Sequence, residues 1–242
     1  MLSHIKNFKN YTLFLKDFIQ FRNQSSNNSR FSKIKWKDRW TCLSENTNET
    51  YFDRHYIYHP AWAARILKKI NPKYHIDISS TLYFSSIASA FIPIKFYDYR
   101  PARLELYNLE IDHADLLCLP FKDESIESIS CMHVIEHIGL GRYGDPINPN
   151  GDLKAIKELK RILAKDGNLL FVVPIGNPKI MFNAHRVYSY DQIIEYFSEL
   201  QLIEFSLIPE NKIDGGIITN PSKELLEKQT YGCGCFWFKR KK

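Results

Sequence analysis

The chain has 242 residues, of which 44% are hydrophobic and 25% charged. These proportions are those of a globular protein, and the length allows a core that needs no disulfide or metal to hold it together. No stretch approaches the roughly 18 uncharged apolar residues of a membrane span. The apolar run at 11–21 contains Lys16 and Asp17 and has no small-residue cleavage site, so we expect no signal peptide.

The net charge of +6 is concentrated at the two ends of the sequence. Residues 1–40 hold nine Lys or Arg side chains, residues 239–242 are all basic, and the rest of the chain is mildly acidic. A nucleic-acid-binding domain carries basic stripes on the fold itself, so we expect no nucleic-acid partner. Basic ends indicate a solvated face or a weak contact with an anionic membrane surface.

The five cysteines are odd in number and scattered along the chain, which favours reduced thiols in a cytoplasmic protein. Cys233 and Cys235 alternate on a predicted strand, so both point to one face, where we expect them to pack. Their spacing does not match a C-x-x-C metal or redox motif.

Residues 1–58 are predicted to form a helical and irregular extension. Apolar side chains from Phe8 onward follow a 3.6-residue period, which predicts an amphipathic helix over 5–22, and a polar linker follows at 23–29. Residues 30–58 show no clear period. The aromatic side chains of the next segment fit either an acceptor pocket or an ordinary core: Tyr51, Phe52, His55, Tyr56, Tyr58, His59 and Trp62.

Residues 59–242 are predicted to form one α/β domain. Pro60 suits the first turn of a helix that ends near Ile70. Short apolar strands then alternate with helical stretches, which predicts a Rossmann-like, seven-stranded, mostly parallel, doubly wound sheet. The predicted strands are 74–78, 94–98, 110–115, 127–132, 168–173, 202–208 and 234–238, and the predicted helices are 82–90, 101–107, 152–164 and 190–200.

Three acidic residues stand at or just beyond the ends of successive predicted strands, namely Asp77, Asp98 and Asp115. In a parallel sheet these ends share one edge, where ligands bind. A carboxylate there accepts two hydrogen bonds from the vicinal hydroxyls of a ribose, and the 21-residue spacing of Asp77 and Asp98 suits a βαβ unit. Asp115 and Leu116 would then meet an adenine ring. Each acid alone is equally explained as a turn or cap residue.

The first loop of the predicted nucleotide site contains no glycine. Its residues are Ser79, Ser80 and Thr81, whose hydroxyl groups suit a helix cap and hydrogen bonds to a cofactor. Their side chains also crowd the approach that glycine normally leaves open. This loop therefore favours weak cofactor binding or none.

His133, Glu136 and His137 match an inverted zinc-peptidase pattern. That pattern needs one continuous helix, with both histidines on one face. Here a predicted strand runs into His133, and glycines follow soon after. We therefore expect no metal, and a zinc hydrolase built on these residues is a remote alternative.

Taken together, these motifs resemble the core of the class I S-adenosylmethionine-dependent methyltransferases over residues 75–176. The resemblance rests on Ala114-Asp115 to Leu119-Pro120-Phe121, His133-Val134-Ile135-Glu136-His137, Leu159-Lys160-Arg161-Ile162-Leu163, Gly167-Asn168-Leu169-Leu170 and Pro174. A closer resemblance is to domain of unknown function family 268, a methyltransferase-like group. It rests on Asp98-Tyr99-Arg100-Pro101, Gly139 to Pro146, Phe182 to Arg186 and Tyr231 to Phe236.

The resemblance implies S-adenosylmethionine as the cofactor, with His133 and Val134 beside it. The full set of predicted cofactor-binding residues is Asp77, Ser79, Ser80, Asp98, Tyr99, Asp115, Leu116, His133 and Val134. Glu136, His137 and His185 are the candidate catalytic residues, because a hydroxyl acceptor benefits from a general base near neutral pKa. Arg142, Tyr143, Asp145 and Arg186 are candidates for orienting a polar or anionic acceptor. Each histidine is equally explained as a buried, hydrogen-bonded structural residue.

The favoured function is methyl transfer to a small polar acceptor, such as the hydroxyl of a sugar or surface-glycan precursor, with a role in glycan biosynthesis. The alternative is a non-catalytic binding module that keeps the fold with a degenerate cofactor loop. The sequence leaves the acceptor and the oligomeric state open.

Overall fold

The computed structural model describes residues 2–25, 30 and 33–241, which fall into two compact units. Residues up to Phe52 form one unit, and residues from Asp53 onward form the other. The boundary predicted at residue 58 therefore falls inside the first helix of the second unit. No helix among the described residues is long and apolar enough to cross a membrane.

The first unit contains a helix, α1 (Leu2–Gln24), and a short 3-10 turn, η1 (Trp36–Asp38). The helix is longer than the predicted 5–22, and it takes up residues 23–24 of the predicted linker, whereas 26–29 lie outside the described residues. Trp36 packs against the helix, with its ring centroid 5.1 Å from that of Phe18 and 6.4 Å from that of Phe14.

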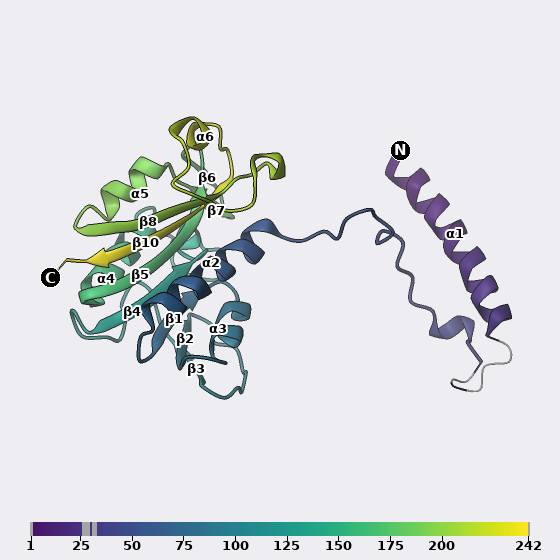
Figure 1. Ribbon diagram of the computed structural model, residues 1–242, viewed down its shortest axis with the longest axis horizontal. Coiled ribbons are helices and arrows are strands. Elements are labelled where there is room, and N and C mark those ends of the chain that lie inside the picture. Colours follow the sequence, from purple (N-terminus) through teal and green to yellow (C-terminus); the bar gives the residue numbers. More distant parts are fainter. Residues whose placement is uncertain (1, 26–29, 31–32, 242) are drawn as a thin grey trace. The chain divides into compact units, whose positions relative to one another are not determined.

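An eight-stranded sheet forms the centre of the second unit (Figure 1), in the order β3-β2-β1-β4-β5-β10-β8-β9. The strands from β3 to β5 are parallel, and β10 lies antiparallel between β5 and β8. Their bounds are β1 His75–Ser79, β2 Ile94–Asp98, β3 Leu109–His113, β4 Ile126–Met132, β5 Leu163–Ile175, β8 Leu200–Ile208, β9 Ile218–Thr219 and β10 Gly232–Arg240. The predicted fold class is confirmed, with the two-residue β9 as an extra edge strand.

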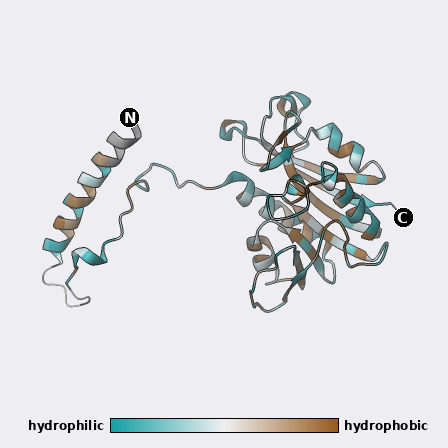
Figure 2. Ribbon diagram, turned by 180° about the vertical axis from the view of Figure 1, so that it is seen from behind, coloured by the Kyte–Doolittle hydropathy of each residue, from teal (hydrophilic) through white to brown (hydrophobic). Residues whose placement is uncertain are grey.

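Helices cover both faces of this sheet. One face carries α2 (Arg54–Ile70) and α3 (Leu82–Ala88), and the other carries α4 (Gly151–Ile162) and α5 (Tyr190–Tyr196). The hydrophobic residues concentrate along the central strands (Figure 2), where the two core clusters meet the sheet. The remaining short elements are η2 (Ile135–His137), β6 (Lys179–Met181), β7 (His185–Val187), η3 (Lys212–Asp214) and α6 (Lys223–Glu227).

Helix α2 begins earlier than its sequence pattern predicted. The Asp53 side chain accepts a hydrogen bond from the Tyr56 amide at 3.2 Å and caps the helix at Arg54, so Pro60 lies inside it. Asn71, in the left-handed conformation, ends the helix. Trp62, Ile66 and Leu67 are buried, as the pattern predicted.

The helix predicted over 101–107 is wrong. This segment is irregular and ends in a turn at Asn108, whose φ of +58° leads directly into β3. About seven residues are too few to make helix formation favourable without an apolar face to bury, and the segment is mostly exposed. The chain therefore crosses from β2 to β3 without a covering helix.

Candidate functional site

A cleft opens at the carboxyl ends of β1, β2, β3 and β4, where the parallel strands share one edge. Its empty space, counted together with the open solvent at its entrance, is about 890 Å³. Its walls combine apolar and polar side chains. The lining residues are Ile78, Ser79, Ser80, Asp98, Tyr99, Arg100, Ala114, Asp115, Leu116, Leu117, His133, Val134, His137, Ile138, Tyr143, Asp145 and Pro146. All of the predicted cofactor-binding residues are among them except Asp77.

Two acids on neighbouring strands lie in this cleft. Asp98 ends β2, and its Oδ1 accepts a hydrogen bond from the Arg100 amide at 2.6 Å. Asp115 follows β3, and its Oδ1 accepts one from the Leu117 amide at 2.8 Å. Each turn fixes the orientation of one carboxylate and uses only one of its two oxygens, so both groups are oriented before any ligand arrives.

The hydroxyl groups of the first loop are engaged within the protein. Ser79 donates to Asp77, and Ser80 shares a hydrogen bond of 3.1 Å with the phenol of Tyr56 on α2. Thr81 caps α3 by accepting from the Tyr83 amide at 3.3 Å. Ser79 and Ser80 therefore line the cleft with their hydroxyl groups already paired.

Asp77 lies outside the cleft, contrary to the expectation from its place at a strand end. Its fully buried carboxylate accepts hydrogen bonds from three serine hydroxyls, those of Ser79, Ser85 and Ser130. Burial raises the pKa of Asp77 to about 6, because desolvation outweighs the three hydrogen bonds that stabilise the charged form. Neighbouring His75 joins the same network through Ser130 at 2.8 Å. Asp77 is thus a core residue that holds β1, α3 and β4 together.

His133 closes β4 in the left-handed conformation, with a φ of +56°. Such a backbone is uncommon for a residue with a side chain and is found at turns and functional sites. Its Nδ1 lies 2.8 Å from Glu136 Oε1, and its Nε2 lies 3.4 Å from Cys233 Sγ. Both ring nitrogens are thus engaged inside the protein, and burial lowers the pKa of His133 to about 3.

Glu136 and His137 form a pair beside the cleft. Glu136 is buried, and desolvation raises its pKa to about 7. Its Oε1 lies 3.9 Å from His137 Nε2, and its Oε2 has no hydrogen-bond partner among the described residues. His137 Nδ1 lies 2.6 Å from the Ala184 carbonyl, so the ring proton sits on Nδ1 and the lone pair on Nε2. Of this pair, only His137 lines the cleft.

The other candidate catalytic and acceptor-binding residues take separate places. His185 is packed on Tyr231 with ring centroids 5.0 Å apart, outside the cleft lining, and burial lowers its pKa. Tyr143 lines the cleft, and the guanidinium of Arg142 lies 5.1 Å from its ring centroid. Asp145 also lines it, and accepts a hydrogen bond from the Gly139 amide at 2.7 Å, which holds the loop closed.

Arg186 does not face the cleft. It is buried, and its guanidinium donates to the Ile138 carbonyl at 2.7 Å and to the Pro149 carbonyl at 3.3 Å. It also lies 3.5 Å from Asp152 Oδ2. These contacts fix the loop after β4, so Arg186 supports the wall of the cleft, and its predicted role toward an acceptor stays a prediction.

The sequence reasoning missed Arg100 as part of the cleft. Its guanidinium lies 4.6 Å from the ring centroid of Tyr143, so the segment after β2 contacts the loop after β4 at this part of the cleft. The Asp98-Tyr99-Arg100 run carried the signal, since it follows a strand end directly. Tyr56 was assigned to an aromatic cluster, and nothing in the sequence indicated its bond to Ser80.

The geometry of an inverted zinc peptidase is not present at His133, Glu136 and His137. Strand β4 ends at Met132, and the following turn η2 is a 3-10 helix of three residues. His133 precedes this turn with a positive φ, so the two histidines do not share the face of an α-helix.

Comparisons with known proteins agree with this architecture. Residues 121–214 match the family model described as Caenorhabditis protein of unknown function, DUF268. An uncharacterised protein of Methanocaldococcus jannaschii is 28% identical over 103 residues, which cover 41% of this chain. The match spans 39% of that relative's length.

Two solved structures share the fold. The YcgJ protein of Bacillus subtilis superposes with a TM-score of 0.53 at 16% identity, over 76% of this chain and 99% of that chain. The 1,6-didemethyltoxoflavin-N1-methyltransferase of Burkholderia thailandensis, solved with S-adenosylhomocysteine, gives a TM-score of 0.54 at 9% identity, over 98% of this chain and 91% of that chain. The chain therefore has the class I methyltransferase fold, and its residues 121–214 carry the match to the DUF268 family.

Proposed function

We propose that the protein is an S-adenosylmethionine-dependent methyltransferase. The observation that supports this proposal is that Asp98 and Asp115, at or just beyond the ends of neighbouring strands, line one cleft together with apolar residues such as Leu116. A carboxylate at the end of β2 suits a ribose diol, and an acid followed by an apolar side chain suits an adenine with its amino group. The methyltransferase of B. thailandensis, which shares the fold, was solved with S-adenosylhomocysteine, which supports the choice of cofactor.

His137 is the general base of this proposal. Because Nδ1 donates to the Ala184 carbonyl, Nε2 is free to take a proton from an acceptor hydroxyl. The Glu136 carboxylate, 3.9 Å from Nε2, stabilises the imidazolium that forms. Glu136 therefore acts through His137 as a positioning residue. S-adenosylmethionine, when bound, supplies a methyl group on a sulfonium for in-line displacement.

A small polar acceptor fits the mouth of the cleft. Arg100 and Tyr143 lie there in contact, and Arg142 stacks on the same ring. Guanidinium groups on an aromatic ring hold polar or anionic groups in a fixed orientation. A hydroxyl of a sugar or surface-glycan precursor remains the acceptor predicted from the sequence, and His185 remains a predicted catalytic residue whose ring lies 6.4 Å from that of His137.

Calorimetry with S-adenosylmethionine and S-adenosylhomocysteine tests the proposal. We expect micromolar binding by the intact chain, weakened about 100-fold by Asp98→Ala, because hydrogen bonds to a charged group contribute about 1.5–3 kcal/mol each. Asp112→Ala is the matched control, since Asp112 lies on the neighbouring strand β3 outside the cleft lining. Absence of binding to well-folded protein would overturn the proposal.

The second candidate is a non-catalytic binding module. It is favoured by the first loop, where Ser79 and Ser80 crowd the cleft with paired hydroxyl groups. A His137→Asn variant separates the two functions once binding is established. Turnover that disappears while cofactor affinity stays within about threefold supports the enzyme, whereas binding without turnover by the wild type supports the module.

A further inference from the structure

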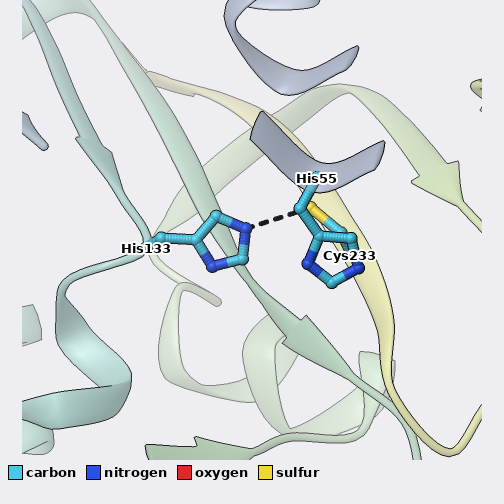
Figure 3. Close-up of side chains that lie close together, drawn as sticks. All are labelled: His55, His133 and Cys233. Carbon is cyan, nitrogen blue, oxygen red and sulfur yellow. Dashed lines mark hydrogen bonds between the residues drawn. The ribbon is translucent and has the colours of Figure 1, made fainter. Parts of the chain in front are cut away.

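Three potential metal ligands lie close together, and one of them, His133, also lines the cleft (Figure 3). His55 comes from the first turn of α2, His133 from the end of β4 and Cys233 from the start of β10. One ligand atom from each residue lies within 4.8 Å of the other two. Residues so far apart in the sequence converge here because α2, which packs on one face of the sheet, begins beside the end of β4 and the start of β10.

The spacing of Cys233 and His133 fits two ligands of a tetrahedral zinc-type ion. Zn–S bonds of about 2.3 Å and Zn–N bonds of about 2.0 Å place a sulfur and a nitrogen about 3.5 Å apart around one ion. Cys233 Sγ and His133 Nε2 lie 3.4 Å apart. The same distance suits a thiol that donates to an imidazole nitrogen, so the two donor atoms face each other with or without an ion.

The outer nitrogen of His133 is engaged with an oxygen acceptor, as it usually is in a metal ligand. His133 Nδ1 lies 2.8 Å from Glu136 Oε1. This arrangement fixes the tautomer in which Nε2 carries a lone pair. A carboxylate that accepts from Nδ1 also makes His133 a stronger ligand.

A buried nitrogen nearby lacks a partner. His59 is fully buried one turn along α2 from His55, and its Nδ1 bonds to the His55 carbonyl at 2.6 Å. Its Nε2 has no hydrogen-bond partner among the described residues, and its ring centroid lies 5.1 Å from that of His133. Leaving such an atom unpaired costs about 1–3 kcal/mol, which a water on an ion beside it would recover.

We propose that His55, His133 and Cys233 bind one divalent zinc-type ion, with a water in the fourth position that bonds to His59 Nε2. Two imidazoles and a thiolate are ligands of borderline softness, which favours zinc over magnesium or calcium. The ion replaces the thiol proton of Cys233, which is released to solvent. The ion fastens the start of α2 to the end of β4, next to the cleft that His133 also lines.

Metal titration of the intact chain tests the proposal. The purified protein is stripped with chelator and titrated with Co²⁺, then with Zn²⁺ in competition. We expect one ion per chain, the charge-transfer absorption of a cobalt–thiolate bond and the intense visible bands of tetrahedral Co²⁺. Cys233→Ala should lose the charge-transfer band and weaken binding more than about 100-fold. Cys235→Ala, a buried cysteine on the same strand, is the matched control and should bind like the wild type.

His55→Gln provides a second variant at a partly exposed position, where folding is less at risk. It should keep the cobalt–thiolate band and weaken binding about 10-fold or more. Folded wild-type protein that takes up no stoichiometric ion, or Cys233→Ala protein that binds as well as Cys235→Ala, would overturn the site. Because these readouts do not involve S-adenosylhomocysteine, their failure is distinguishable from failure of the methyltransferase proposal.

Discussion

Replacing Asp77 by Ala tests whether this residue stabilises the core of the fold or binds cofactor in the cleft. The substitution leaves three buried serine hydroxyls without their acceptor. At about 1–3 kcal/mol for each unpaired group, the loss is about 5 kcal/mol. Removing a buried carboxylate whose pKa is raised to about 6 returns about 3 kcal/mol near pH 7. We therefore expect a net loss of about 2 kcal/mol in the free energy of unfolding at pH 7.

The pH dependence of this loss gives a check on its sign. The pKa of Asp77 in the folded state lies above the unfolded value, so its contribution to stability is full at low pH and declines as the pH rises through 6. Urea unfolding followed by circular dichroism should thus show Asp77→Ala about 1 kcal/mol more destabilising at pH 5 than at pH 7. Equal losses at the two pH values would contradict the assignment of a raised pKa.

Calorimetry on the same variants completes the test. Asp77→Ala protein that remains folded should bind S-adenosylhomocysteine within about threefold of the wild type, because the carboxylate does not line the cleft. Asp98→Ala should do the reverse, with near-normal stability and lost affinity. Folded Asp77→Ala protein that loses affinity as strongly as Asp98→Ala would refute the division between core and cleft.

Three further substitutions probe the surroundings of the site. His75 is fully buried with a pKa lowered to about 3, so the stability that it contributes is present above about pH 6.5 and is lost as the pH falls. Between pH 7 and pH 5 the wild type should lose about 2 kcal/mol more than His75→Gln in urea unfolding, and parallel curves would contradict this. Arg186→Met should lower the free energy of unfolding by about 2–4 kcal/mol, because two backbone carbonyls lose the buried guanidinium that donates to them. Unchanged thermal unfolding would show that the loop keeps its structure without Arg186. Gly139→Ala should lower the free energy of unfolding by more than about 2 kcal/mol, because a Cβ there would overlap the Asn148 carbonyl oxygen. Gly144→Ala, at a similar φ but in open space, should lower it by about 1 kcal/mol. Equal losses for the two variants in thermal unfolding would contradict the clash.

The sheet could be predicted from the sequence because each strand is recognisable from its own short run of apolar residues. The predicted strand 94–98 coincides with β2, and the ends of the others differ by a few residues. The same local reasoning produced the wrong helix at 101–107, because propensity does not show that this short segment stays mostly exposed and buries little apolar surface. The local pattern also placed both Asp77 and Asp98 at strand ends, so both were expected in the cleft. Only the packing of α3 shows that Ser85 donates a hydrogen bond to Asp77, which is buried in the core and does not line the cleft.

The histidine and cysteine cluster was beyond the reach of sequence reasoning. Cys233 lies 100 residues from His133 along the chain, and its neighbour Cys235 suggested only a packed face. Metal motifs are recognised by short spacings on one element, whereas these three ligands come from three elements. Asp98 and Asp115 were different, since the ends of neighbouring parallel strands meet by topology alone.

The position of β10 has a consequence for the order in which the molecule assembles. This strand follows β5 and β8 along the sequence, yet it pairs with both of them and lies between them in the finished sheet. Until it arrives, two long strand edges stand open, and such edges attract other chains. Strands β8 and β9 can therefore join the sheet only after β10 has paired with β5.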